Sequence, residues 1–101
     1  MADVDVSVSA LPTGLASLAD GRRGFSGVIA DVRASATIGG LSASELERRL
    51  LEMGFVEGAR VEILHEGFIG GDPICVGLDD MRVALRRRDA RSVLVRPDPL
   101  R

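Results

Sequence analysis

The stretch LLEMGFVEGARVEILHE, residues 50–66, decides the fold of this chain. Its first half continues an amphipathic helical pattern, in which apolar side chains recur on one face from Leu46 to Met53. Its second half alternates apolar and polar residues, which is typical of a strand. Glycine adopts positive φ without the Cβ penalty, so the sequence predicts a helix that ends at Gly54 and a turn at Gly58 that leads into the strand.

The residues before this unit predict a first strand and the start of the helix. Residues 25–34 are rich in β-branched side chains and alternate in polarity, so they form the first predicted strand, and residues 35–44 form a loop. The helix is expected to begin near Ser42 or Ser44. Ser44 followed by Glu47 fits a capping box, in which each side chain bonds to a backbone N–H at the helix start.

The residues after the unit are predicted to be almost entirely β. A short helical turn is expected just before the last strand, at residues 87–91, and Gly70 and Gly71 join Gly54 and Gly58 as structural turn residues. The four strands predicted in this half cover residues 60–66, 74–78, 81–87 and 92–96. We therefore expect a mostly β protein, a small five-stranded barrel with one α-helix inserted after the first strand.

Composition and charge limit the classes of protein. With 101 residues and 46% hydrophobic content, the chain is expected to form one globular domain. No apolar run approaches the length of a membrane span, and the N-terminus carries acids where a secretory signal needs bases. We expect a cytoplasmic protein without membrane insertion, a flexible arm at residues 1–13 and a tail at residues 97–101. The net charge of −2 does not favour nucleic acid binding.

Three ordered motifs resemble those of the FeoA family, the ferrous iron transport protein A of bacteria. The motifs are RRLLEMGFVEGARVEIL at residues 48–64, GGDPI at residues 70–74 and VALRRRDARSVLV at residues 83–95. The chain departs from the family pattern at Glu57, at Asp80 and at an inserted Asp72.

The resemblance implies an SH3-like barrel over residues 14–96 and a non-catalytic accessory role in ferrous iron uptake. It also implies a partner, the cytosolic GTPase region of the membrane iron permease. An open barrel edge would in addition allow a homo-oligomer.

Exposed apolar and basic side chains are the candidates for partner contact. A loop rarely places two large apolar side chains outward without reason, so the pair at the tip of the 67–73 loop indicates a docking surface. The arginines near the last two strands form either a solvated face or a surface for an acidic partner. Phe55 also fits a core position. The predicted partner-binding residues are Leu51, Phe55, Phe68, Ile69, Arg82 and Arg86.

His65 and Cys75 suggest a transition-metal site. If the strands on either side of Gly70 form a hairpin centred on that glycine, these two residues face each other, with Cβ atoms about 4.5–5.5 Å apart. Imidazole and thiolate are suitable ligands for transition metals, but two ligands do not make a site. The pair therefore remains a weak metal candidate, and the default expectation is that no cofactor binds.

The sequence carries no motif of an enzyme. It has neither a phosphate-binding glycine loop nor a nucleophile elbow nor a metalloprotease helix, and its single histidine is His65. The hypothesis is thus a binding module. Two alternatives stay open: a stand-alone relative of the SH3-like domain that ends iron-dependent repressors, and a metal carrier that uses His65 and Cys75.

Overall fold

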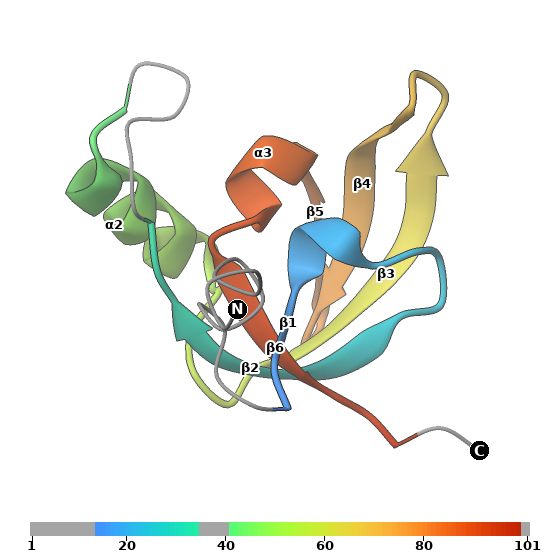
Figure 1. Cartoon of the computed structure of the whole chain (residues 1–101), viewed down its shortest axis with the longest axis horizontal. Coiled ribbons are helices and arrows are strands. Elements are labelled where there is room, and N and C mark those ends of the chain that lie inside the picture. The colour runs from blue at the N-terminus through green and yellow to red at the C-terminus, as the bar shows by residue number, and fades with distance from the viewer. Residues whose placement is uncertain (1–13, 35–40, 100–101) are drawn as a thin grey trace, which may run out of the picture.

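A computed structural model describes residues 14–34 and 41–99, in which a strongly curved antiparallel sheet carries one long helix (Figure 1). The strand order in the sheet is β1-β6-β2-β3-β4-β5. In this view helix α2 lies on the left of the molecule and the tip of the β3–β4 hairpin at the upper right. The elements are β1 (Ala16–Ser17), the 3₁₀ turn η2 (Leu18–Asp20), β2 (Ser26–Val32), α2 (Ala43–Met53), β3 (Arg60–Gly67), β4 (Gly71–Leu78), β5 (Met81–Leu85), α3 (Arg87–Ala90) and β6 (Val93–Pro97).

The expected five-stranded barrel is wrong in two details. The sheet has six strands and is open, because β1 and β5 stand at its two ends and do not pair with each other. Strand β1 has only two residues, and it forms because Ala16 and Ser17 meet Val95 and Leu94 of β6, far away in the sequence. The short helical turn predicted before the last strand is confirmed as α3. It makes a second helix where one was expected, and α2 follows β2, the second strand, rather than the first.

The N-cap of helix α2 is Ser42, two residues before the serine of the predicted Ser44 capping box. The Glu45 N–H donates to Ser42 Oγ at 3.2 Å, and the Ser42 N–H donates to Glu45 Oε1 at 3.0 Å. Both serines are followed by glutamate three positions later, so the local pattern fits either start. Glu47 instead accepts a hydrogen bond from the Ala34 N–H at 2.8 Å, which links the helix to the end of the preceding segment.

The cap leads to a prediction for Ser42→Ala. We expect the free energy of unfolding to fall by about 1 kcal/mol, because the Glu45 N–H loses its acceptor. The hydrogen bond from the Ser42 N–H also lowers the pKa of Glu45. The stabilisation from this carboxylate is therefore present at neutral pH and is lost as the pH falls through the lowered pKa. Urea unfolding at neutral and acidic pH measures both effects. Ser44→Ala is the control, and an equal loss in Ser44→Ala would contradict the assignment of the cap.

The C-terminal end of α2 follows the sequence prediction. Gly54 has φ of 107°, in the left-handed region, and its N–H bonds to carbonyls of the last turn. The Phe55 N–H donates to Leu50 O at 3.0 Å, and the chain then leads into β3. Gly58, Gly70 and Gly71 also have positive φ. The helix–glycine–strand unit therefore directs Phe55 inward.

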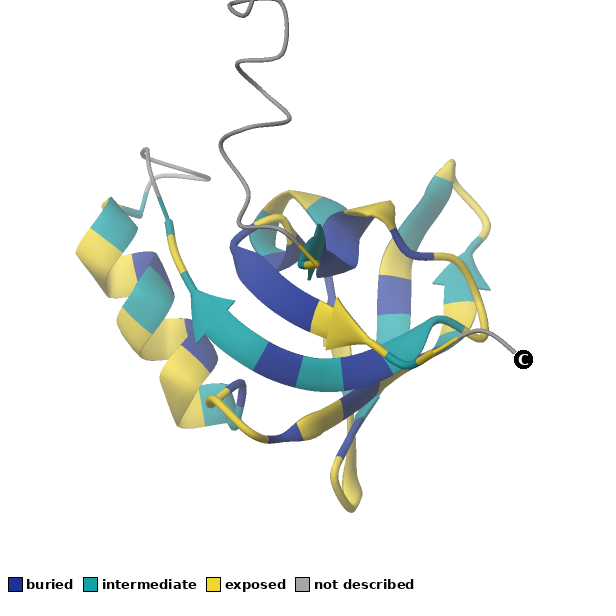
Figure 2. Ribbon diagram, turned by 60° about the horizontal axis from the view of Figure 1, so that its bottom comes forward, coloured by how far each residue is buried: buried dark blue, intermediate teal, exposed yellow. Residues whose placement is uncertain are grey.

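The core lies inside the curve of the sheet, under α2 and η2. Buried and partly exposed residues alternate along the first half of β2, from Ser26 to Ala30, as the ribbon coloured by burial shows (Figure 2). This alternation is what a sheet with one covered face requires. The largest fully buried side chains are Phe55, Leu18, Ile29, Leu46, Leu50, Ile63, Ile74, Leu78, Val61, Val76, Val93 and Val95.

The predicted arm at residues 1–13 lies outside the described residues, as do residues 100–101 of the predicted tail. Within the described ranges, no helix has the length and hydropathy needed to cross a membrane.

Candidate functional site

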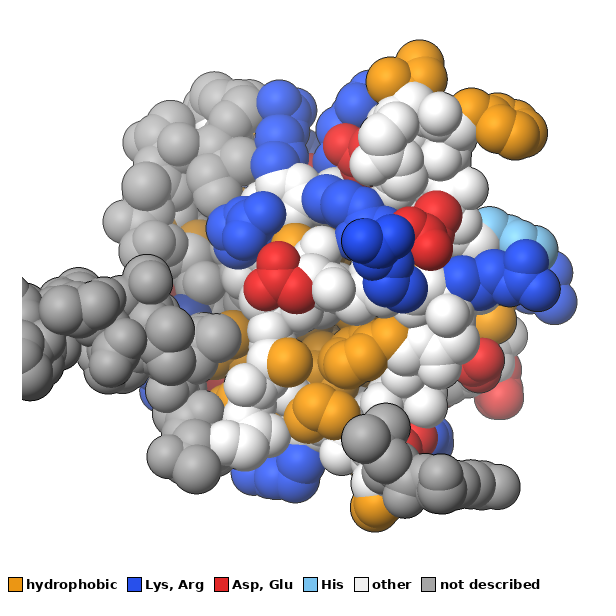
Figure 3. Space-filling view, turned by 45° about the vertical axis from the view of Figure 1, so that its right-hand side comes forward, with side chains coloured by type: hydrophobic (Ala, Val, Ile, Leu, Met, Phe, Trp, Pro, Cys, Tyr) orange, Lys and Arg blue, Asp and Glu red, His pale blue; other side chains and the backbone are white. Residues whose placement is uncertain are grey.

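The tip of the β3–β4 hairpin exposes two large apolar side chains. Phe68 is 106% exposed and Ile69 is 85% exposed, and both follow Gly67 at the end of β3. The turn is closed by the Asp72 N–H, which donates to Ile69 O at 3.1 Å. In the space-filling view, hydrophobic side chains project from the top of the molecule, where the hairpin ends (Figure 3). The tip therefore presents two neighbouring apolar groups to solvent with their backbone held in a closed turn.

A partly buried arginine holds the base of this hairpin. The Arg87 guanidinium donates to Glu66 Oε1 at 2.8 Å and to Gly71 O at 2.9 Å. It also donates to Ala19 O at 2.7 Å and to Gly21 O at 2.9 Å, in the segment around η2. One side chain thus joins both hairpin strands to a segment near the start of the domain. We call this arrangement the Arg87 clasp.

Two further hydrogen bonds stabilise the Arg87 clasp. The Arg87 N–H donates to Asp72 Oδ1 at 2.9 Å, and the second oxygen of Glu66 accepts from the Arg23 N–H at 3.0 Å. Charge-assisted hydrogen bonds of this kind are about twice as strong as neutral ones. Asp72, which lengthens the loop relative to the family pattern, therefore has a structural role at the start of β4, next to the hairpin turn.

The sequence did not single out Arg87. It stands in the run Arg86-Arg87-Arg88, whose composition predicts a solvated basic face, and its two neighbours are indeed exposed. A signal was nevertheless present, because Glu66 stands just before the glycine loop and its carboxylate favours a nearby cation if another segment packs against the loop. Only the tertiary structure shows which of the three arginines supplies that cation.

The six residues predicted for partner contact do not form one surface. Phe55 is fully buried, so its assignment to a partner surface is wrong. The left-handed turn at Gly54, which ends α2, directs the Phe55 side chain into the core. Leu51 is 47% exposed on α2, at the end of the molecule away from the hairpin (Figure 1). Arg82 and Arg86 are exposed at β5 and just after it. Phe68 and Ile69 alone lie next to each other at the hairpin tip.

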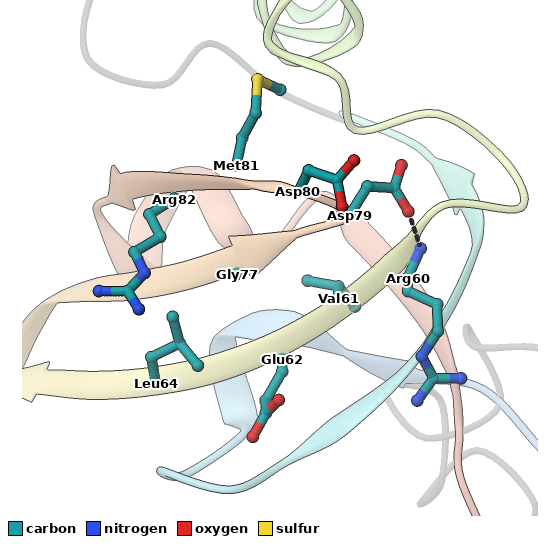
Figure 4. Close-up of a pocket in the computed structure, with 9 residues that line it drawn as sticks. All are labelled: Arg60, Val61, Glu62, Leu64, Gly77, Asp79, Asp80, Met81 and Arg82. Atoms are coloured by element: carbon teal, nitrogen blue, oxygen red, sulfur yellow. Dashed lines mark hydrogen bonds between the residues drawn. The ribbon is translucent and has the colours of Figure 1, made fainter.

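A shallow hollow of about 320 Å³ lies over the outer face of β3, β4 and β5. Its floor is open because Gly77 has no side chain, and a Cβ there would lie 3.3 Å from Leu64 Cδ1. At one end the Arg60 N–H donates to Asp79 Oδ1 at 3.0 Å, while Arg82 extends across the strands (Figure 4). The rim carries both signs of charge, so the hollow shows no preference for one kind of ion.

The predicted pairing of His65 with Cys75 is confirmed. The two residues are register partners in the β3–β4 ladder, next to a bulge that follows Ile63. His65 is exposed and Cys75 is half-buried. Within the described ranges, no group of three or more histidine, cysteine, aspartate or glutamate residues is placed to hold a metal ion. The metal site therefore stays a prediction that rests on two ligands.

With this geometry established, the comparisons with known proteins decide the family. The profile of the FeoA domain matches residues 16–97. The chain belongs to the FeoA family. A search of the curated proteins found no match.

Solved structures agree with this membership. The FeoA protein of Stenotrophomonas maltophilia, solved with zinc, is 33% identical with a TM-score of 0.64 over 79% of this chain and 88% of that one. Its description names it an SH3 domain protein and a candidate activating factor of ferrous iron transport. FeoA from Chlorobium tepidum is 26% identical with a TM-score of 0.62, over 79% of this chain and 69% of that one. The fold of the FeoA chain described here is thus SH3-like.

A manganese-dependent transcriptional repressor shares the same fold. It is 22% identical with a TM-score of 0.68, and the match covers 86% of this chain but only 38% of that one. At this identity the likeness concerns the fold alone.

Proposed function

We propose that this FeoA-family protein is a non-catalytic, cytoplasmic accessory protein of bacterial ferrous iron uptake that binds the cytosolic GTPase region of the iron permease. The single observation that carries the proposal is the exposed pair Phe68–Ile69 on a braced hairpin, in a chain whose family and 33%-identical relative concern ferrous iron transport. A protein of this kind acts by docking, so its functional groups are those that a partner would cover.

The energetics of the tip support this role. A phenylalanine buries about 150–250 Å² in an interface, and each Å² of apolar area removed from water contributes about 25 cal/mol. Two such side chains side by side can therefore serve as interface anchors. Anchors bind best when they lose little conformational freedom, and the Arg87 clasp reduces that loss by fixing the hairpin before binding.

The chemistry of the exposed surface also supports a binding module. In the described part of the chain the exposed groups include apolar side chains, arginines and carboxylates, no three acids, histidines or cysteines gather in one place, and His65 has Cys75 as its cross-strand partner. General acid–base catalysis needs titratable groups that converge on one reacting position. The hairpin tip instead offers shape and apolar area, which favour protein recognition.

The double variant Phe68→Ser, Ile69→Ser tests this proposal. We expect it to bind the purified GTPase region of the permease at least about tenfold more weakly than the wild type, because truncation of a central anchor typically costs 2 kcal/mol or more. Its thermal midpoint should match that of the wild type, since both side chains are exposed. Biolayer interferometry with the full-length protein measures the affinity.

Val56→Ser is the matched control, since it removes an exposed apolar side chain in the turn before β3, at the opposite end of that strand from the hairpin tip. Wild-type affinity in the double variant would refute the tip as the docking site. Absence of binding by the wild-type protein would refute the permease as the partner.

A further inference from the structure

A groove of about 360 Å³ separates α2 from the last residues of β5 and from α3. Its apolar lining comes from Leu41 and Met53 on one side and from Leu85 on the other. Ala84 and Leu85 both line it, although Ala84 is exposed and Leu85 is buried. Successive side chains of a strand point to opposite faces, so a hollow that touches both lies along the edge of the strand.

In the part of the chain that the structure describes, that edge has no strand beside it. β5 stands at the end of the sheet and, among the described residues, pairs only with β4. It is five residues long, whereas β1 at the other end of the sheet has two. An unpaired edge presents a row of backbone N–H and C=O groups, and an extended segment of another protein can bind there by strand addition.

The charges around the groove are biased toward one sign. Arg49 comes from α2, Arg88 comes from α3, and Arg86 lies between β5 and α3, so cations reach the groove from both of its sides. The one acid in the lining is Asp89, whose carboxylate lies 3.9 Å from Arg88 Nε. The chain as a whole has a net charge of −2, so this positive region stands against the overall charge. Complementary charge selects an acidic ligand and speeds its approach.

We propose that this groove binds an extended segment of a partner protein in which acidic and apolar residues alternate. The segment adds to the free edge of β5 as a further antiparallel or parallel strand. Its apolar side chains, at every second position, enter the groove beside Met53 and Leu85, and its carboxylates meet Arg49, Arg86 and Arg88. The site is separate from the Phe68–Ile69 tip, and the inference does not depend on the identity of the partner that binds there.

The probe for this site is a fluorescently labelled, N-acetylated peptide of sequence VDVEVDV, measured by fluorescence anisotropy with the full-length protein. We expect saturable binding that weakens at high salt. The variant Arg49→Glu, Arg88→Glu should bind at least about tenfold more weakly, since its carboxylates repel those of the peptide. The control variant Arg48→Glu, Arg96→Glu makes the same charge change at exposed positions outside the groove and should bind as the wild type does.

Strand addition is tested by backbone chemistry. Two versions of the peptide are N-methylated at alternate positions, so that one has lost the N–H groups that face β5 and the other has lost those that face away. We expect one version to lose binding and the other to keep it. The variant Phe68→Ser, Ile69→Ser should bind the peptide as the wild type does, so failure at the tip and failure at the groove are distinguishable.

Several outcomes would overturn the inference. They are absence of peptide binding, equal binding by the groove variant and its control, and equal loss with both N-methylated peptides. Binding of a polyglutamate peptide or a single-stranded oligonucleotide as tight as that of VDVEVDV would show a general anion surface and would overturn it as well. The thermal unfolding of the groove variant is compared with that of its control, so a folding defect is recognised.

Discussion

Phe55→Ala is expected to lower the free energy of unfolding by about 4 kcal/mol, the largest effect of any single substitution considered for this protein. Phe55 has no exposed surface and lies where the chain turns from α2 toward β3. Removal of its ring loses the transfer free energy of the apolar atoms and leaves a cavity that the surrounding side chains fill only in part. Urea unfolding followed by circular dichroism measures the change.

Phe68→Ala is the matched control for this prediction. It removes the same ring from a fully exposed position, so we expect a change within about 0.5 kcal/mol. The two phenylalanines therefore have opposite roles: Phe55→Ala should lower stability, whereas Phe68→Ala should lower partner affinity. If both variants were equally destabilised, Phe68 would have to be buried in solution and the assignment of the tip as a docking site would fail.

Arg87→Met is expected to cost about 3 kcal/mol, because removal of one partner of a partly buried ion pair leaves polar groups without donors. Four hydrogen bonds of the guanidinium are lost, three to carbonyl oxygens and one to Glu66. Methionine keeps much of the aliphatic length, so the loss reflects the donors rather than the packing. The free energy of unfolding from urea titration gives the magnitude.

Arg86→Met is the control for Arg87→Met. Arg86 is an exposed neighbour in the same run of arginines, and its replacement should change stability by no more than about 0.5 kcal/mol. Arg87→Lys should recover only part of the loss, since an ammonium group cannot reach all of the acceptors that the planar guanidinium bonds. Equal stability of the Arg86 and Arg87 variants would contradict the clasp.

The Arg87 clasp also connects stability with recognition. If it orders the hairpin, amide exchange at the β3–β4 tip should become faster in Arg87→Met than in Arg86→Met, since local stability depends on such contacts. Partner affinity should fall with it, because a mobile tip pays an ordering cost on binding. A residue that contacts no partner would then control binding through the position of Phe68 and Ile69.

Patterns between near neighbours determined much of this protein from the sequence alone. The helical stripe that ends at Gly54, the turn at Gly58 and the alternating strand after it all lie within one local unit. The pairing of His65 with Cys75 followed from a hairpin centred on Gly70, and the family followed from three short motifs in order. These features depend on backbone preferences and on side-chain spacing, which the local sequence contains.

Long-range contacts decided the rest. Segments that meet only after folding decide three features of the structure. These features are which phenylalanine is buried, which of three arginines forms the clasp, and whether the two residues before η2 become a strand. The Arg87–Ala19 bond spans 68 positions, and β1 exists because β6 lies beside it. Arg86, Arg87 and Arg88 have the same local propensities, so a choice among them requires acceptors that the folded sheet alone brings together.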